Sequence, residues 1–444
     1  MSSLLICNAT LVNENRLVEN DIFVKNGRID QIGNDLGHLN AQTTLDAQGQ
    51  FLMPGMIDDQ VHFREPGFTH KADIASESRA AIAGGITSYM EMPNCNPLTI
   101  TPEALADKYA TAAEKSLANY AFYFGASNDN IEYIKALDPK SCCGVKVFMG
   151  ASTGNMLVDN PETLEQIFTH SPVLIATHCE NTPMIQANEA KFKQQYGDDI
   201  PVKYHPQIRS VDACYASSSF AVQLAKNHHS RLHVLHLTTE KELALFDAGP
   251  IDNKQITAEV CVHHLFFNES DYAEKGNLIK CNPAIKTAKD QQALIQAVND
   301  DRIDIIATDH APHTWEEKQQ NYTRAPAGLP LVQHALLSLL ENYHKGIFSL
   351  ELIVNKVCHA PAKRFELVDR GYLREGYWAD IVLLDLKNPS KVSRENILYK
   401  CGWSPFADYE FKSRIATTII NGAIVYRNGE LVNDSKGVAL EYNR

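Results

Sequence analysis

Five short apolar runs along the middle of the chain each lead to a polar side chain that can bind a metal. The runs at residues 56–57, 144–145, 173–177, 232–235 and 303–308 lead to His62, Lys146, His178, His236 and Asp309. Each run is short enough to be one buried strand. In a parallel barrel the carboxyl ends of all strands open on one face, which holds the active site. Three imidazoles, a carboxylate and a lysine would then converge, a nitrogen and oxygen donor set that suits zinc and similar ions.

Any one of these residues has a plainer interpretation. A single histidine at a strand end is most often a hydrogen-bonded polar group without a metal. The five together, with the sequence Thr-Asp-His-Ala-Pro-His at residues 308–313, favour the metal centre of a hydrolase.

Both ends of the chain alternate short apolar segments with turns. Strands are predicted at residues 4–6, 21–24 and 28–32, and again at 379–385, 416–420 and 423–426. Lys25-Asn26-Gly27 and Asn421-Gly422 are hairpin turn signals. We expect residues 1–54 and 366–444 to pair into one composite β-sandwich, which brackets a hydrolase domain of residues 55–365.

Between these ends, predicted strands alternate with helices. One helix is predicted from Ser76 to Gly84, and Thr101-Pro102 opens the next. Apolar periodicity predicts later helices over residues 331–343 and 350–357, the second capped by Ser349. This alternation is typical of parallel strands with crossover helices, and therefore of the α/β class.

Composition narrows the function classes. The 444 residues are 44% hydrophobic and 21% charged, and the net charge of −13 argues against a nucleic-acid partner. Ten cysteines without a C-x-x-C pair indicate reduced thiols and a cytoplasmic protein. We expect neither a signal peptide nor a membrane span, since the first residues lack a basic segment and no apolar run reaches ~18 residues.

Motifs along nearly the whole chain resemble the dihydroorotase family, in the cyclic amidohydrolase branch of the amidohydrolase superfamily. They lie at residues 62–67, 92–94, 176–180, 235–239, 280–283, 308–313 and 376–382. The resemblance implies a (β/α)₈ TIM-type barrel with a composite β-sandwich. It also implies reversible cyclisation of N-carbamoyl-L-aspartate to L-dihydroorotate, a step of pyrimidine synthesis.

The resemblance gives the metal-centre residues their roles. One or two zinc ions are expected on His62, Lys146, His178, His236 and Asp309. Lys146 would carry CO₂ as a carbamate, which requires a neutral amine, and burial lowers the pKa of a lysine. Otherwise Lys146 is a lysine whose stem is buried and whose ammonium reaches solvent. Asp309 would bind metal, accept a proton from the attacking water and return it to the leaving nitrogen.

Gln60 departs from the family pattern, which has His-x-His on the first strand. Side chains two apart on a strand point the same way, so Gln60 should face the site beside His62. An amide oxygen is a poorer zinc ligand than an imidazole nitrogen. Either the first metal position is weakened or one metal suffices.

The resemblance also implies a set of substrate contacts. Arg64 and Asn94 would bind the free carboxylate of the substrate, since a guanidinium recognises a carboxylate in bidentate fashion. The plainer interpretation of Arg64 is an ion pair with Glu65 or Asp73. The other expected contacts are Asn282, His313, Ala327 and Gly328.

The roles of three further histidines stay open. His233 is left out of the metal set because an odd offset from His236 places it on the other strand face. His263 and His264 follow another possible barrel strand. They would either donate hydrogen bonds to the residues around the metal or simply pack in the core.

Other functions stay open at this point. Allantoinase and hydantoinase or dihydropyrimidinase are related, but many of their substrates lack the carboxylate that Arg64 and Asn94 would bind. A non-catalytic homologue that scaffolds aspartate transcarbamoylase is a further alternative, with Gln60 as its support. The expected partners are a small-molecule substrate and a second copy of the chain in a homodimer. Association with aspartate transcarbamoylase is a further expectation.

Overall fold

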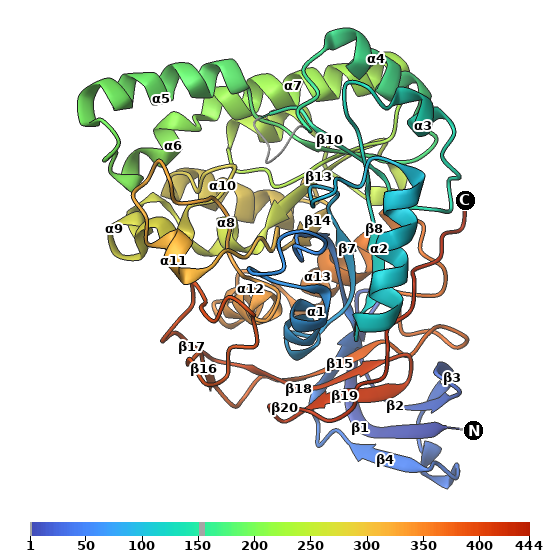
Figure 1. The fold of residues 1–444 in the computed structure, drawn as a ribbon. Coiled ribbons are helices and arrows are strands. Elements are labelled where there is room, and N and C mark those ends of the chain that lie inside the picture. The colour runs from blue at the N-terminus through green and yellow to red at the C-terminus, as the bar shows by residue number, and fades with distance from the viewer. Residues whose placement is uncertain (1, 151–155) are drawn as a thin grey trace.

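A computed structural model describes residues 2–150 and 156–444 of the chain. It has two parts, a parallel barrel surrounded by helices and a β-rich part built from both ends of the sequence (Figure 1). In Figure 1 the N-terminal strands, in blue, and the C-terminal strands, in red, lie together below the barrel. The fold class predicted from the sequence is confirmed.

The barrel consists of parallel strands connected by helices. Its strands are β6 (Met56–Val61), β7 (Ile86–Glu91), β8 (Asn119–Phe122), β9 (Phe124–Gly125), β10 (Val145–Phe148), β11 (Ile175–His178), β12 (Leu232–Val234), β13 (Ile256–Cys261) and β14 (Ile305–Ala307). The short segments β8 and β9 follow each other directly and complete one strand position between β7 and β10. The circle closes where the His62 amide donates to the His310 carbonyl over 2.7 Å, beside a parallel bridge between Val61 and His310. Closure removes free sheet edges and directs all carboxyl ends to one face.

The longer helices of the barrel are α1 (Ile74–Ala83), α2 (Pro102–Lys115), α4 (Pro161–His170), α5 (Thr182–Tyr196), α7 (Val211–His228), α10 (Ala288–Asn299) and α12 (Ala335–His344). Shorter ones are α3 (Ile131–Lys135), α6 (His205–Ile208), α8 (Val262–Phe266), α9 (Tyr272–Lys275), α11 (Trp315–Lys318), α13 (Leu350–Val354) and α14 (Ala360–Arg364). Two predicted caps are confirmed, since Thr101 accepts from the Ala104 amide and Ser349 from the Leu352 amide.

Three helix boundaries differ from the prediction. The first helix starts at Ile74, because a capping box on Asp73 begins it two residues earlier. The helix predicted from residue 331 starts at Ala335, because the Leu331 and Val332 amides donate to Nδ1 of His310 instead of entering a helix. The helix predicted over 350–357 ends at Val354 and continues as a π-helical turn over residues 355–359.

The β-rich part is one nine-stranded sheet to which both ends of the chain contribute. The N-terminal strands are β1 (Ser3–Asn13), β2 (Arg16–Lys25), β3 (Arg28–Gly33), β4 (Thr43–Asp46) and β5 (Phe51–Pro54), and the C-terminal ones are β15 (Ile381–Asp385), β18 (Arg414–Ile420), β19 (Ala423–Arg427) and β20 (Glu430–Leu431). Strands β5 and β15 pair antiparallel and join the two halves. A separate pair, β16 (Ser390–Lys391) and β17 (Glu410–Phe411), lies outside this sheet.

Both predicted hairpin turns are confirmed. Asn26 and Gly27 have φ of 53° and 83°, and Asn421 and Gly422 have φ of 49° and 78°. Two consecutive left-handed residues are the type I′ geometry that matches the twist of paired strands.

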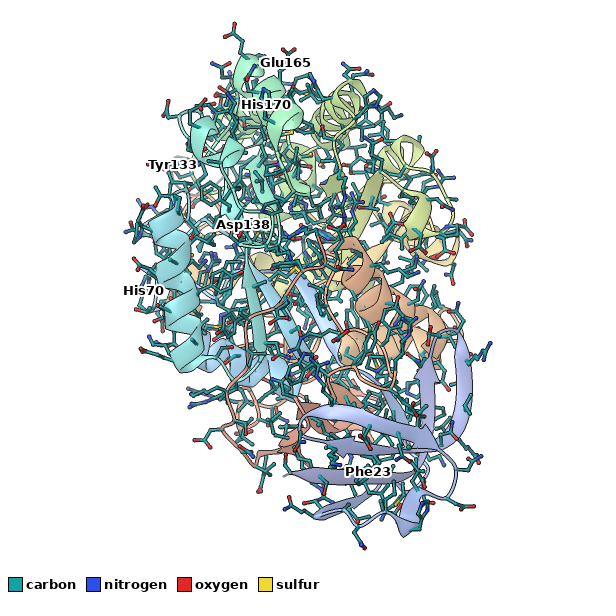
Figure 2. All side chains as sticks on the ribbon, turned by 90° about the vertical axis from the view of Figure 1, so that its right-hand side faces the viewer. Phe23, His70, Tyr133, Asp138, Glu165 and His170 are labelled. Carbon is teal, nitrogen blue, oxygen red and sulfur yellow. The ribbon has the colours of Figure 1, made fainter. Side chains whose placement is uncertain are left out.

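The β-rich part has an apolar core of its own. That core joins side chains of both halves, among them Ile6, Ile22, Ile381 and Ile419. Figure 2 shows Phe23 of β2 at the opposite end of the molecule from Glu165 and His170 of α4. Among the helices that the structure describes, none is long and apolar enough to cross a membrane.

Candidate active site

A single cavity at the carboxyl ends of the barrel strands gathers all eleven residues predicted for the site. Its volume is about 80 Å³, several times the ~10–15 Å³ that one water requires. It is lined by His62, Arg64, Asn94, Lys146, His178, His236, Asn282, Asp309, His313, Ala327 and Gly328, together with Gln60, Phe148 and Ala311. The geometry therefore fits one site for metal and substrate.

The strand ends explain this convergence. His62 directly follows β6, Lys146 lies within β10 and His178 is the last residue of β11. His236 and Asp309 each come two residues after a strand and have positive φ, at 42° and 50°. A non-glycine residue in this region is uncommon, and here the turned backbone lies at the cavity.

His62 and Asp309 form a hydrogen-bonded pair across the barrel closure. Nε2 of His62 lies 3.1 Å from Oδ1 of Asp309, and its Nδ1 lies 2.8 Å from Oδ1 of Asn94. Burial lowers the pKa of His62 although Asp309 acts in the opposite direction. The ring is therefore neutral at physiological pH, the form in which an imidazole binds metal.

Gln60 faces the site, but with its amide nitrogen. Its Nε2 donates to Oδ1 of Asp309 over 3.1 Å, while its Oε1 lies 3.9 Å from Sγ of Cys261. A carboxylate can only accept, so the NH₂ group must point toward Asp309. The oxygen that could bind a metal thus points toward Cys261.

His178 and His236 converge at the other side of the cavity. Nδ1 of His178 lies 3.0 Å from Nε2 of His236. Nε2 of His178 lies 3.1 Å from Glu180, which also pairs with Arg209. Burial lowers the pKa of both histidines. A ring held by an outer carboxylate, as that of His178 is by Glu180, is typical of a metal-binding histidine.

Lys146 is 1% exposed, and its Nζ lies 4.6 Å from the centre of the Phe148 ring. Burial lowers the pKa of Lys146 to about 8, against the opposing effect of Asp309. The neutral amine is therefore more accessible here than in an exposed lysine. A buried lysine at this position has no ordinary route to solvent, which disfavours the plainer interpretation.

These donors fit a divalent metal. Three neutral imidazoles, one carboxylate and one lysine with a lowered pKa meet at one cavity. Nitrogen and oxygen donors of this kind suit zinc. Gln60, where the family pattern has a histidine, presents a hydrogen-bond donor to this set.

Arg64 lies in the cavity without the ion pair that the plainer interpretation required. Its Nε donates to the Pro312 carbonyl over 3.0 Å, and Nη2 lies 3.1 Å from His313. Glu65 pairs with Lys115 and Asp73 with Lys400. The guanidinium is thus positioned by neutral groups.

A loop lines the cavity with Ala327 and Gly328. Gly328 has φ of 141°, and a Cβ there would come within 2.3 Å of the Ala311 carbonyl oxygen. Only glycine fits this close approach. The amide of Gly328 donates to the Lys280 carbonyl over 2.9 Å. Oδ1 of Asn282 is buried with no hydrogen-bond partner among the described residues, which leaves it available to a ligand.

Two buried lysines whose contacts the sequence did not predict hold this loop. Nζ of Lys318 donates to the carbonyls of Lys280, Pro326 and Gly328 over 3.0 to 3.1 Å. Nζ of Lys280 donates to the carbonyls of Tyr322 and Ala325 over 2.6 Å. Burial lowers the pKa of Lys318 to about 7. Lysine is rarely buried, so the sequence carries no signal for either role.

His233 lies outside the cavity lining, inside the barrel. Its Nε2 is 3.2 Å from Asp59 and 3.6 Å from Glu259, and its Nδ1 contacts Thr257. Glu259 also accepts from the His236 amide over 3.0 Å. This buried network therefore supports the turn that carries His236.

Comparison with known proteins agrees with this geometry. Residues 51–425 match the model of the amidohydrolase family. The chain is 31% identical over 419 residues to a dihydroorotase of Methanosarcina acetivorans, covering 91% of this chain and 88% of that one. It is 30% identical over 416 residues to an allantoinase of Bacillus velezensis, covering 92% and 90%.

A solved structure is similar over the same length. The L-hydantoinase (dihydropyrimidinase) of Arthrobacter aurescens superposes with a TM-score of 0.94 at 27% sequence identity. The superposition covers 99% of this chain and 100% of that one.

Proposed function

The chain belongs to the amidohydrolase family, and on this premise we propose that it is a dihydroorotase. It would interconvert N-carbamoyl-L-aspartate and L-dihydroorotate, in pyrimidine synthesis. Amidohydrolases are metal-dependent, and the converging donors His62, His178, His236 and Asp309 support a metal in this chain.

One observation favours dihydroorotate over related cyclic amides. Arg64 is 8% exposed and lines the cavity, and its polar contacts among the described residues are the Pro312 carbonyl and His313. A buried cation without an anionic partner is costly. The ring carboxylate of dihydroorotate would supply that partner, and Asn94 lines the same cavity.

We propose one or two zinc ions on His62, Lys146, His178, His236 and Asp309, with Lys146 carrying CO₂ as a carbamate. The lowered pKa of Lys146 supports the carbamate, because the neutral amine is the form that reacts with CO₂. A bound divalent metal would lower the pKa of water and polarise the substrate carbonyl.

The side chains of this protein would transfer protons and orient the substrate. In hydrolysis, water oxygen bonds to the ring carbonyl carbon and the ring C–N bond breaks. Asp309 accepts one proton from that water and returns it to the leaving nitrogen. Its contact with His62 Nε2 holds the carboxylate in place. Arg64, Asn94, Asn282, His313 and the loop at Ala327 and Gly328 would orient the ring.

A hydrolysis assay with three substrates tests this proposal. The purified protein should hydrolyse dihydroorotate well above allantoin and an unsubstituted hydantoin, and exhaustive chelation should abolish turnover until zinc is restored. Preference for either uncharged ring would contradict the dihydroorotase assignment. Full turnover after chelation would contradict the metal.

Homodimer formation, association with aspartate transcarbamoylase and a cytoplasmic location stay predictions from the sequence. Sedimentation of the purified chain, alone and mixed with the transcarbamoylase, tests the first two.

A further inference from the structure

A second group of possible metal ligands lies at the end of β13, outside the cavity lining. Cys261 is the last residue of that strand, and His263 and His264 lie in the short helix α8 that follows. One ligand atom from each lies within 4.8 Å of the other two. Around a tetrahedral ion with bonds of ~2.0–2.3 Å, ligand atoms are roughly 3.5 Å apart, so small side-chain rotations would close the group.

The two histidines of this group are buried and their ring nitrogens are poorly satisfied, whereas Sγ of Cys261 donates to Oε1 of Glu259 over 3.6 Å. His263 is 0% exposed, and among the described residues neither of its ring nitrogens has a hydrogen-bond partner of normal geometry. The Thr308 carbonyl lies near the ring, outside this geometry. A buried imidazole without such partners requires an explanation, and a bound ion provides one.

His264 has the arrangement of a metal-binding histidine. Its Nε2 lies 3.2 Å from the Pro283 carbonyl, which can only accept, so this nitrogen carries the proton. Nδ1 then keeps its lone pair, and it has no partner among the described residues. Metal-binding histidines typically donate the other ring N–H to a carbonyl or carboxylate in this way.

The group lies directly behind Gln60. Sγ of Cys261 is 3.9 Å from Oε1 of Gln60, whose Nε2 donates to Asp309. One amide therefore separates this group from the carboxylate of the cavity. An ion here would adjoin the cavity at the position where Gln60 departs from the family pattern.

We propose that Cys261, His263 and His264 form a site for a zinc-class transition ion, adjoining but separate from the cavity. A thiolate with two imidazoles is a donor set for zinc or a softer ion. On binding, the S–H bond of Cys261 breaks, its proton passes to solvent and a sulfur–metal bond forms. The proposal does not depend on dihydroorotase activity.

Cobalt(II) tests the site, because cobalt bound to a thiolate absorbs strongly in the near ultraviolet by charge transfer. The donors proposed around the cavity contain no thiol, so a cobalt ion bound in the cavity would not give this absorption. Metal-free protein titrated with cobalt should develop the band, and Cys261→Ser should lose it. His263→Gln should weaken cobalt binding in this band by at least ~10-fold.

Cys179→Ser is the matched control, since Cys179 is buried and adjoins the proposed ligand His178. It should keep the band. Absence of the band in the wild-type protein, or an equal band in Cys261→Ser, would overturn the proposal.

Crystals of the wild-type protein soaked in zinc test the site without a variant, so the result does not depend on whether a variant folds. Anomalous diffraction at the zinc edge should show a peak between Cys261, His263 and His264, apart from any peak at His178 and His236. Density for water alone at this position would equally overturn the proposal.

Discussion

Gln60 and Asp309 lie 249 residues apart in the chain, and the amide nitrogen of one donates to the carboxylate of the other over 3.1 Å. The amide donor of Gln60 occupies one acceptor site of Asp309. It also points the only oxygen of the Gln60 side chain toward Cys261. Where the family pattern has a histidine, this chain therefore places a hydrogen-bond donor.

We predict that Gln60→His strengthens the metal position beside His62 and Asp309. An imidazole offers a lone pair where the amide offers an N–H, so zinc affinity there should rise by at least ~10-fold. Calorimetric titration of metal-free protein with zinc should show two unequal steps in the wild type and closer steps in the variant. Gln60→Asn is the control, and two equally tight steps in the wild type would contradict this account.

Asp309→Asn should lower kcat by ~10²–10⁴-fold, because an amide cannot accept and return the proton. The variant should stay folded, since an asparagine oxygen can still accept from Gln60 and His62. Steady-state hydrolysis of dihydroorotate and a thermal melt measure both effects. Asp107→Asn, on the exposed face of α2, serves as the control. Retention of more than about a tenth of the wild-type rate would remove Asp309 from proton transfer.

Arg64→Ala should raise KM for dihydroorotate by an amount worth ~2–5 kcal/mol, because a desolvated charge pair is lost. A cyclic imide without a carboxylate should be affected much less. Arg64→Lys keeps the charge but not the planar fork, so it should recover only part of the loss. Equal losses on both substrates would show that Arg64 only supports the Pro312 carbonyl and His313.

Acid should destabilise the fold through its buried histidines. The contribution of one of them, His334, can be measured separately. Burial lowers the pKa of His334 to about 3, so between pH ~6.5 and ~3 the unfolded chain binds a proton that the folded chain does not. Stability therefore falls as pH falls through this window. His334→Gln should lessen the slope by about one proton, about 1.4 kcal/mol per pH unit.

Urea unfolding at several pH values, with a chelator present, measures this slope. His70→Gln is the control, because His70 is exposed on the surface (Figure 2). An unchanged slope in His334→Gln would mean that His334 is protonated in the folded protein.

The sequence predicted those features that depend on local chemistry. The turns at Asn26-Gly27 and Asn421-Gly422 and the caps at Thr101 and Ser349 are confirmed, since each depends on a few neighbouring residues. The predicted site residues meet at one cavity because parallel strands end on one face. Their roles stay predictions until the variants are measured.

Features set by distant contacts could not be predicted. The helix start at Ala335 depends on His310, which takes the amides of Leu331 and Val332. The direction of the Gln60 amide depends on Asp309. Lys318 reaches three loop carbonyls that no spacing in the sequence reveals.

The closure of the barrel between β6 and β14 has a consequence for how the protein is made. His62 and Asp309 meet only there, at a sequence separation of 247 residues. At a synthesis rate of ~5–20 residues per second, roughly 10–50 s separate the emergence of the two side chains from the ribosome. Lys146 and His178 belong to the neighbouring strands β10 and β11, and His236 follows the next strand, β12, so these three can gather earlier. We therefore expect the proposed ligands to come together in this order. A chain truncated before Asp309 would keep four of the five proposed ligands but would lack the contact between His62 and Asp309 at the closure of the barrel.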